Sequence, residues 1–228
     1  MYAYLVLSAA LLWLWGCTST PPPRAAAHPP AFTVLLESEP PGAQLFLRGQ
    51  PLGSSPRTIN VAQWEEILDL VATLGDEKPR ETRVRWLGSR EVVVRYYFGN
   101  PTPLMQRLGL ARVLVFDFSA KTTFDVDRSE IKPEFAEMLQ VQAQLLRTHF
   151  PQLKFFVCGH ADSSGGYQHN LQLSLQRATA VRDFLAAQGV PRANMTVLGL
   201  GPDYAETDNT TTEGRARNRR TELILPQI

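Results

Sequence analysis

The fold is decided by the stretch Leu153-Lys154-Phe155-Phe156-Val157-Cys158-Gly159-His160-Ala161-Asp162, in which an apolar run ends on polar side chains. Residues 153–159 predict a buried strand, because the run is short, apolar and bounded by glycine. Asp162 follows in a loop that continues as Ser163-Ser164-Gly165-Gly166. A side chain placed just past a strand end is held by the sheet and stays accessible to a ligand. The stretch therefore predicts both a core strand and a candidate binding residue.

Strands and helices alternate around that stretch. Residues 112–118, 195–199 and 221–225 predict three more strands. A first helix is predicted to begin at Pro133, with an apolar face of Phe135, Leu139, Leu145 and Leu146. A second helix is predicted to end at Gly189, with Leu171, Leu175, Ala178, Val181 and Leu185 at three- and four-residue steps. Strands interleaved with helices predict an α/β sandwich, in which helices pack on a mixed β-sheet.

The residues before this region show a different pattern. Residues 32–36 and 43–48 alternate apolar and polar side chains around the turn Pro40-Pro41-Gly42, which predicts two short strands. Further strands are predicted at 82–87 and 91–98, and a short helix at 64–74. The sequence Gly99-Asn100-Pro101-Thr102-Pro103 interrupts the pattern. We therefore predict an α+β protein, with a small β-rich domain at 31–103 and the α/β sandwich at 104–228.

The first thirty residues have the pattern of an exported chain. The apolar run at 5–15 is shorter than the roughly 20 residues of a membrane span and has the length of a secretory signal. It ends in Leu14-Trp15-Gly16-Cys17, which resembles the bacterial lipobox. The resemblance implies a signal peptide at 1–16 and a lipidated Cys17, followed up to residue 30 by a proline-rich linker. The alternative is a signal of another kind, with Cys17 inert.

Composition excludes several classes of protein. The chain has 228 residues, of which 44% are hydrophobic and 20% charged, so a largely disordered chain and a polytopic membrane protein are both excluded. Lys and Arg number 23 against 22 Asp and Glu, and this balance does not indicate a nucleic-acid partner. Besides Cys17 the chain has one cysteine, Cys158, which we expect to be buried as a small apolar side chain.

Four clusters lie at the ends of the predicted elements. They are Phe124-Asp125, then Gly159-His160-Ala161-Asp162, then Asn170-x-x-Leu173-Ser174-x-x-Arg177-Ala178, and Gly214-Arg215-x-x-Asn218-Arg219-Arg220. In this order and spacing they resemble the OmpA-like peptidoglycan-binding domain, over residues 110–227. Residues 38–49, followed by Gly53 and Pro56, resemble the PEGA motif of small bacterial surface β-domains.

The OmpA-like resemblance implies a ligand and the residues that hold it. The ligand is the peptide stem of peptidoglycan, in particular diaminopimelate, whose free end presents an ammonium and a carboxylate side by side. The resemblance assigns the ammonium to Asp162 and the carboxylate to Arg177. An arginine suits that role because its planar guanidinium meets a carboxylate through two hydrogen bonds. The other pocket positions fall on Phe124, Asp125, Asn170, Leu173 and Arg220.

Other interpretations of the same residues compete with this one. Asp162 and Arg177 are also a possible structural ion pair. His160, Asp162 and His169 have no metal-ligand spacing, and Cys158 with His160 has no third catalytic group. The basic run at 215–220 is better explained as a helix end that supports the pocket than as a nucleic-acid patch. We therefore expect neither a metal, a cofactor nor an enzymatic activity.

The sequence predicts an outer-membrane lipoprotein that faces the periplasm and ties the membrane to the cell wall. Its partners would be peptidoglycan and, through the lipid anchor, the outer membrane. The alternative is a wall-anchoring subunit of a larger envelope assembly, such as a secretion system, pilus or motor. In that case residues 31–103 would bind a protein partner.

Overall fold

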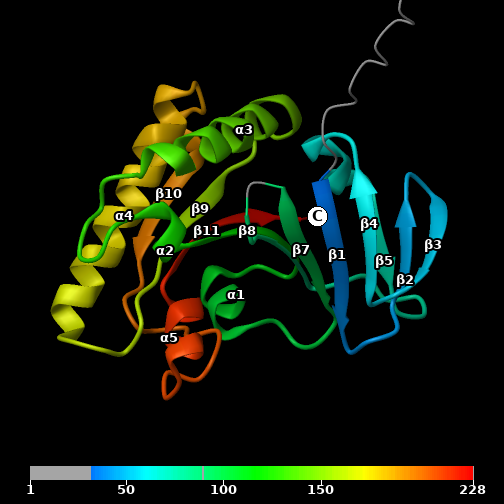
Figure 1. The fold of residues 1–228 in the computed structure, drawn as a ribbon, viewed down its shortest axis with the longest axis horizontal. Coiled ribbons are helices and arrows are strands. Elements are labelled where there is room, and N and C mark those ends of the chain that lie inside the picture. Colours follow the sequence, from blue (N-terminus) through cyan, green and yellow to red (C-terminus); the bar gives the residue numbers. More distant parts are fainter. Residues whose placement is uncertain (1–31, 89, 228) are drawn as a thin grey trace, which may run out of the picture. The chain divides into compact units, whose positions relative to one another are not determined.

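One mixed sheet of eight strands runs through the residues that the computed structural model describes, 32–88 and 90–227 (Figure 1). Its strand order is β10-β9-β11-β8-β6-β7-β1-β4. The strands are β1 (Phe32–Glu39), β4 (Arg57–Val61), β6 (Glu81–Trp86), β7 (Glu91–Tyr97), β8 (Val113–Ser119), β9 (Phe155–Gly159), β10 (Met195–Gly199) and β11 (Arg220–Pro226). A second sheet has the order β3-β2-β5 and contains β2 (Gln44–Leu47), β3 (Gln50–Ser54) and β5 (Leu70–Thr73).

Helices α3 (Pro133–His149) and α4 (Tyr167–Ala187) confirm the two helices predicted on the sheet. Parallel pairing of β9 with β10 and antiparallel pairing of β11 with both β8 and β9 confirm the mixed sheet. The shorter helices are α1 (Pro103–Leu108), α2 (Ala120–Thr123), α5 (Thr212–Asn218) and the 3₁₀ turns η1 (Trp64–Asp69) and η2 (Arg192–Asn194). Within the described ranges, no helix has both the length and the apolar character to cross a bilayer.

The helix predicted at 64–74 is wrong in its second half. The chain forms the 3₁₀ turn η1 and then the strand β5, which pairs with β2. Leu70 and Ala72 are buried, whereas Val71 between them is 48% exposed. This alternation has the two-residue period of a strand. It extends over only four residues, so in the sequence it is a weaker signal than the helical spacing of Trp64 and Ile67.

Strands from the two predicted domains join side by side. β6 pairs in parallel with β8, from Glu81 opposite Val113 to Arg85 opposite Asp117. β8 therefore lies between β6 and β11 and has no open edge. Residues 31–103 and 104–228 thus share one sheet, and the chain around Pro103 is the connection between two parts of it.

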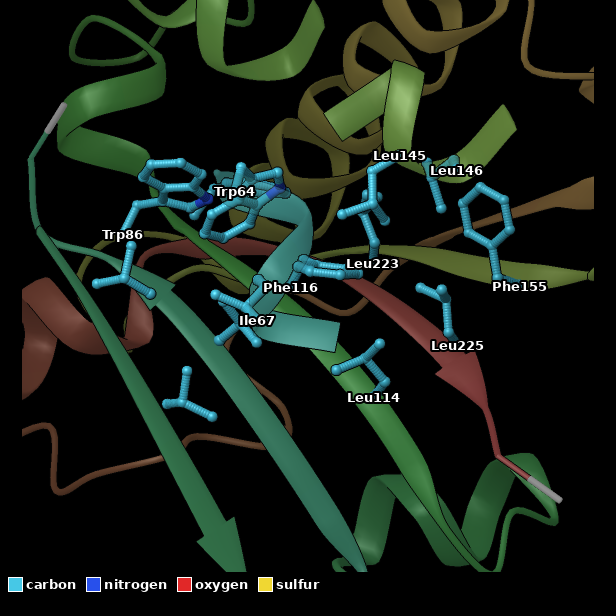
Figure 2. Close-up of a cluster of buried hydrophobic side chains, with 14 of the residues drawn as sticks. Trp64, Ile67, Trp86, Leu114, Phe116, Leu145, Leu146, Phe155, Leu223 and Leu225 are labelled. Carbon is cyan, nitrogen blue, oxygen red and sulfur yellow. The ribbon is translucent and has the colours of Figure 1, made fainter. Parts of the chain in front are cut away.

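The shared sheet has an apolar core on the face covered by α3 and α4. Side chains from β8 and β11 point into it and meet Leu145 and Leu146 of α3 (Figure 2). Trp64 and Trp86, from the first half of the chain, pack on the same core with ring centroids 4.0 Å apart. The strand residues are Leu114, Phe116, Leu223 and Leu225. Burial of apolar surface therefore stabilises both halves together.

The opposite face of the sheet carries a buried ion network. Arg83 of β6 donates to Glu222 of β11 over 2.6 Å, to Asp117 of β8 over 3.1 Å and to Glu81 over 2.7 Å. Burial by itself would raise the pKa of the Glu222 carboxyl, but the positive charges of Arg220 and Arg83 outweigh it and hold the pKa well below its usual range. Glu222 therefore stays ionised in the interior, and Arg83 is one of the charges that make this possible.

Two glycines allow α4 to lie close to the strands. A Cβ added to Gly159 of β9 would overlap the backbone carbonyl of Ser174, and one added to Gly199 of β10 would press on the backbone of Leu175. Only residues without a side chain fit between these backbones. This close approach sets the position of α4 relative to the end of β9.

We expect Arg83→Met to lower the free energy of unfolding by about 3–5 kcal/mol, because it removes the positive charge that Glu81, Asp117 and Glu222 share. Urea denaturation measures the change. The matched control is Arg95→Met, which removes a more exposed ion pair with Glu37 and should cost no more than about 1 kcal/mol. Equal losses in the two variants would contradict a special role for Arg83.

We expect Gly159→Ala to destabilise the protein by about 1–3 kcal/mol, because α4 or β9 must shift to admit the methyl group. Thermal unfolding followed by circular dichroism measures the effect. Gly88→Ala is the control, since nothing lies within 4 Å of the Cβ it would add. A Gly159→Ala variant as stable as the control would show that the contact with Ser174 does not constrain the fold.

Candidate functional site

Asp162 lies in the loop that follows β9. The loop is fixed by two backbone hydrogen bonds, from His160 N to Arg220 O over 2.9 Å and from Ala161 N to Gly201 O over 2.7 Å. The Asp162 side chain is buried and has partners for both carboxylate oxygens. Its Oδ1 accepts from the backbone N of Ser164 over 2.8 Å and from the Ser164 hydroxyl, and its Oδ2 accepts from Arg219 Nη1.

These contacts keep Asp162 charged. Burial alone would raise the pKa of its carboxyl, but the hydrogen bonds from Ser164 and the guanidinium of Arg219 outweigh that effect and hold the pKa below its ordinary value. An ionised carboxylate in a mostly buried position attracts a cation more strongly than one in open water. Asp162 is therefore suited to bind an ammonium group.

Asn170 ties α4 to this loop. Its Nδ2 donates to the backbone carbonyl of Asp162 over 3.2 Å and to that of Ser164 over 2.6 Å. Asn170, Leu173 and Arg177 follow each other at three- and four-residue steps, so they share one face of the helix. The same helix that holds the loop thus presents Arg177 on the side of Asp162.

Arg177 is buried and is held by neutral groups. Its Nε donates to the carbonyl of Arg128 over 2.9 Å, its Nη2 donates to the carbonyl of Asp125 over 3.2 Å, and its guanidinium lies 5.1 Å from the ring centroid of Phe124. In the part of the chain that the structure describes, its Nη1 makes no hydrogen bond and no carboxylate forms an ion pair with it. Arg177 therefore keeps a donor for an anionic ligand.

The pKa of Arg177 reflects this environment. Burial lowers the pKa of the guanidinium; Asp127 opposes the shift, and the neighbouring charge of Arg219 adds to it. Arg219 therefore acts on both candidate residues, as the ion-pair partner of Asp162 and as a like charge close enough to affect Arg177. The alternative of a structural ion pair between Asp162 and Arg177 is wrong for this structure, because the partner of Asp162 is Arg219.

The sequence interpretation included Arg219 in the fourth cluster but assigned only its neighbour Arg220 to the pocket. Arg220 lies in the ion network on the other face of the sheet, where its Nε donates to Glu222 over 2.7 Å and its Nη2 to the carbonyl of Tyr204 over 3.2 Å. Consecutive side chains at a strand start point to opposite sides. Arg220, Glu222 and Ile224 follow at two-residue steps along β11 and therefore share one face of the sheet, and this spacing is the signal that separates Arg220 from the Asp162 loop.

The remaining predicted residues have supporting positions. Phe124 is buried under the Arg177 guanidinium, and Asp125 contributes its backbone carbonyl to Arg177 while its exposed carboxylate pairs with Lys132 over 3.1 Å. Leu173 is half-buried on α4. The structure therefore links Asp162 with Asn170, and Arg177 with Phe124 and Asp125. Helix α4 and Arg219 join these two sets into one connected group, and Arg220 lies outside it.

The structure tests the prediction for Cys158 but not the prediction for Cys17. Cys158 is fully buried, as expected, and burial raises the pKa of its thiol far above neutrality, so the thiolate does not form under ordinary conditions. Its neighbour His160 instead contacts Glu222, with Nε2 and Oε2 3.2 Å apart. Cys17 and the predicted signal and linker lie outside the described residues.

The second half of the chain is similar to known proteins. Residues 123–219 match the model of the OmpA family. A probable lipoprotein, YiaD, of Escherichia coli K12 is 37% identical over 115 residues, which are 50% of this chain and 52% of the relative. A peptidoglycan-associated lipoprotein of Agrobacterium fabrum is 37% identical over 102 residues, which are 45% of this chain and 57% of the relative. The chain thus spans about half the length of the curated relatives it matches.

Among solved structures, the cell wall anchor of the T6SS from Pseudomonas aeruginosa is similar with a TM-score of 0.46 and 28% identity, over 50% of this chain and 81% of that one. The peptidoglycan-associated lipoprotein from Burkholderia pseudomallei has a TM-score of 0.43 and 31% identity, over 48% of this chain and 88% of that one. The connected group around Asp162 and Arg177 falls within the matched residues, and the chain contains an OmpA family domain at residues 123–219.

Proposed function

We propose that this protein binds peptidoglycan without a covalent bond, through the diaminopimelate of the peptide stem. Asp162 binds the ammonium group at the free end of that residue, and Arg177 binds its carboxylate. The observation that carries the proposal is the pair of buried, oppositely charged side chains, held by one loop and one helix and not neutralised by each other. A zwitterion offers Arg177 a carboxylate partner and offers Asp162 an ammonium group that competes with Arg219.

Arg219 gives the site a way to exchange partners. Its guanidinium pairs with Asp162, so an incoming ammonium group competes for the same carboxylate. Once displaced, Arg219 lies near Arg177 and adds a second positive charge for the carboxylate of the ligand. Binding therefore replaces one ion pair within the protein by two between protein and ligand, which favours a zwitterion over a simple amine.

The strength of each contact sets the mode of attachment. A hydrogen bond to a charged group contributes about 1.5–3 kcal/mol, whereas micromolar affinity needs about 8 kcal/mol. Two side chains therefore hold one stem weakly. Many copies anchored over a polymer with repeated stems gain from effective concentration. Each single contact with a stem is then reversible, whereas the attachment of many copies to the polymer is long-lived.

The anchoring half of the proposal concerns the membrane. A lipid on Cys17 holds the protein in the outer membrane with the folded part in the periplasm. Residues 18–30, if extended as a proline-rich segment, span about 40 Å at roughly 3.1 Å per residue. The names of the relatives from E. coli, a probable lipoprotein, and A. fabrum, a peptidoglycan-associated lipoprotein, support this part of the proposal. The protein thereby ties the outer membrane to the wall.

We expect Asp162→Asn and Arg177→Gln each to weaken binding to isolated sacculi by roughly tenfold or more, since each removes a charge-assisted contact. Sedimentation of the protein with sacculi measures binding, and circular dichroism checks the fold. Asp183→Asn is the control, because Asp183 is in an exposed ion-pair cluster with Arg182 and Arg192.

Free diaminopimelate should release the wild-type protein from the sacculi, and 1,5-diaminopentane, which has the amines without the carboxylates, should not. Unchanged sedimentation of both variants would refute the assignment of the two residues. Release by 1,5-diaminopentane would show that binding does not require contact between Arg177 and the carboxylate of the ligand.

We expect Cys17→Ala to abolish incorporation of labelled palmitate in a bacterial host and to move the protein from the membrane fraction to the soluble periplasmic fraction. The physical reason is that acyl chains contribute about 0.8 kcal/mol per buried CH₂. Cys158→Ala is the matched control and should keep both the label and the membrane location. A labelled Cys17→Ala variant would rule out this cysteine as the site of lipidation.

A further inference from the structure

A cavity of about 290 Å³ lies on the face of the sheet opposite to α3 and α4. Both halves of the chain line it: Glu39, Arg83 and Tyr97 come from the first half, and Leu104, Arg217 and Ile224 come from the second. It is thus separate from the group around Asp162 and Arg177, none of whose side chains line it. Its volume is at the lower end of the range for ligand pockets, which suits a molecule of amino-acid or dipeptide size.

The floor of this cavity is apolar and rigid. Leu104 and Met105 of α1 pack with Val113, Val115 and Ile224 in a separate buried cluster. The first turn of α1 is fixed by its cap, because the Thr102 hydroxyl accepts from Met105 N over 3.3 Å and Pro103 occupies the first helical position. The surface that a ligand would meet is therefore formed before any ligand arrives.

The buried charges in the cavity wall satisfy one another. Glu222 accepts from Arg83 over 2.6 Å and from Arg220 over 2.7 Å. Glu81 accepts from Arg83 over 2.7 Å, and Glu206 lies 3.8 Å from Arg220. These groups give the wall a fixed, nearly neutral polar surface and do not require a ligand for compensation.

Two charged side chains in the cavity lining are not part of these ion pairs. Glu39, at the end of β1, and Arg217, on α5, are exposed at the cavity, and within residues 32–88 and 90–227 neither side chain makes a hydrogen bond or an ion pair. They have opposite charges and belong to different halves of the chain. A ligand in this cavity meets a carboxylate, a guanidinium and an apolar surface.

We propose that this cavity is a second binding site, for a small zwitterion with an apolar side chain, such as a hydrophobic amino acid or dipeptide. The ammonium group of the ligand pairs with Glu39, its carboxylate with Arg217, and its side chain packs on Leu104 and Met105. Because the site needs strands and helices from both halves, it exists only where β6 and β8 join them. The proposal does not depend on peptidoglycan binding at Asp162.

Titration calorimetry of the full-length protein in detergent, with leucyl-leucine as the probe, tests the proposal. We expect one bound dipeptide per chain. The N-acetylated and the C-amidated dipeptides should each bind at least tenfold more weakly, because each lacks one of the two charges. Equal binding of either blocked form would overturn the proposal that the ligand is a zwitterion, and no binding of leucyl-leucine at millimolar concentration would overturn the site itself.

Variants locate the bound probe. Arg217→Gln and Glu39→Gln should each weaken binding about tenfold, and Ala205→Trp, which fills the mouth from an exposed loop position, should abolish it. Lys154→Gln removes an exposed charge outside the lining and should have no effect. Asp162→Asn distinguishes the two sites: it should keep dipeptide binding. If Asp162→Asn abolished dipeptide binding and Arg217→Gln preserved it, the dipeptide would bind at the Asp162 site. That result would refute this proposal.

Discussion

The contact of Arg83 with the carboxylates of Asp117 and Glu222 is the interaction on which the rest of the structure depends. Arg83 belongs to β6, whereas its partners belong to β8 and β11, so the ion network crosses from one half of the chain to the other. Each carboxylate is almost completely buried and would be costly without a positive charge beside it. The pairing of β6 with β8 brings that charge into place.

The candidate site depends on the same strand. β11 carries Arg220 and Glu222 into the ion network, and Arg219, directly before it, contacts Asp162 on the other side. A shift of β11 by one residue would exchange the two faces. The position of Arg219 is therefore fixed by the buried charges of its neighbours, and the local geometry at Asp162 is linked to the junction between the halves.

Much of the fold can be predicted from the sequence, because each strand around the site is an apolar run with local boundaries and each long helix has an apolar stripe. The pairing of β6 with β8 is different. It joins residues about thirty positions apart in the chain, and the glycine and proline residues at 99–103 have the local pattern of a domain boundary. Motif spacing predicts Asp162, Arg177 and Asn170 as site residues, whereas the strand register is needed to see that Arg219, and not Arg220, contacts Asp162.

The shared sheet also has a mechanical consequence. Tension between the start of β1 and the loop after β9 is transmitted through a series of adjacent ladders, from β1 through β7, β6, β8 and β11 to β9. A load directed along paired strands stretches all the hydrogen bonds of a ladder at once, so that they resist as a group, whereas a load across the strands opens them one after another. Because β1 and β9 run in opposite directions, the start of β1 and the end of β9 lie at the same end of the sheet. A pull between these two points therefore loads the ladders across the strands, and the hydrogen bonds nearest to that end would open first.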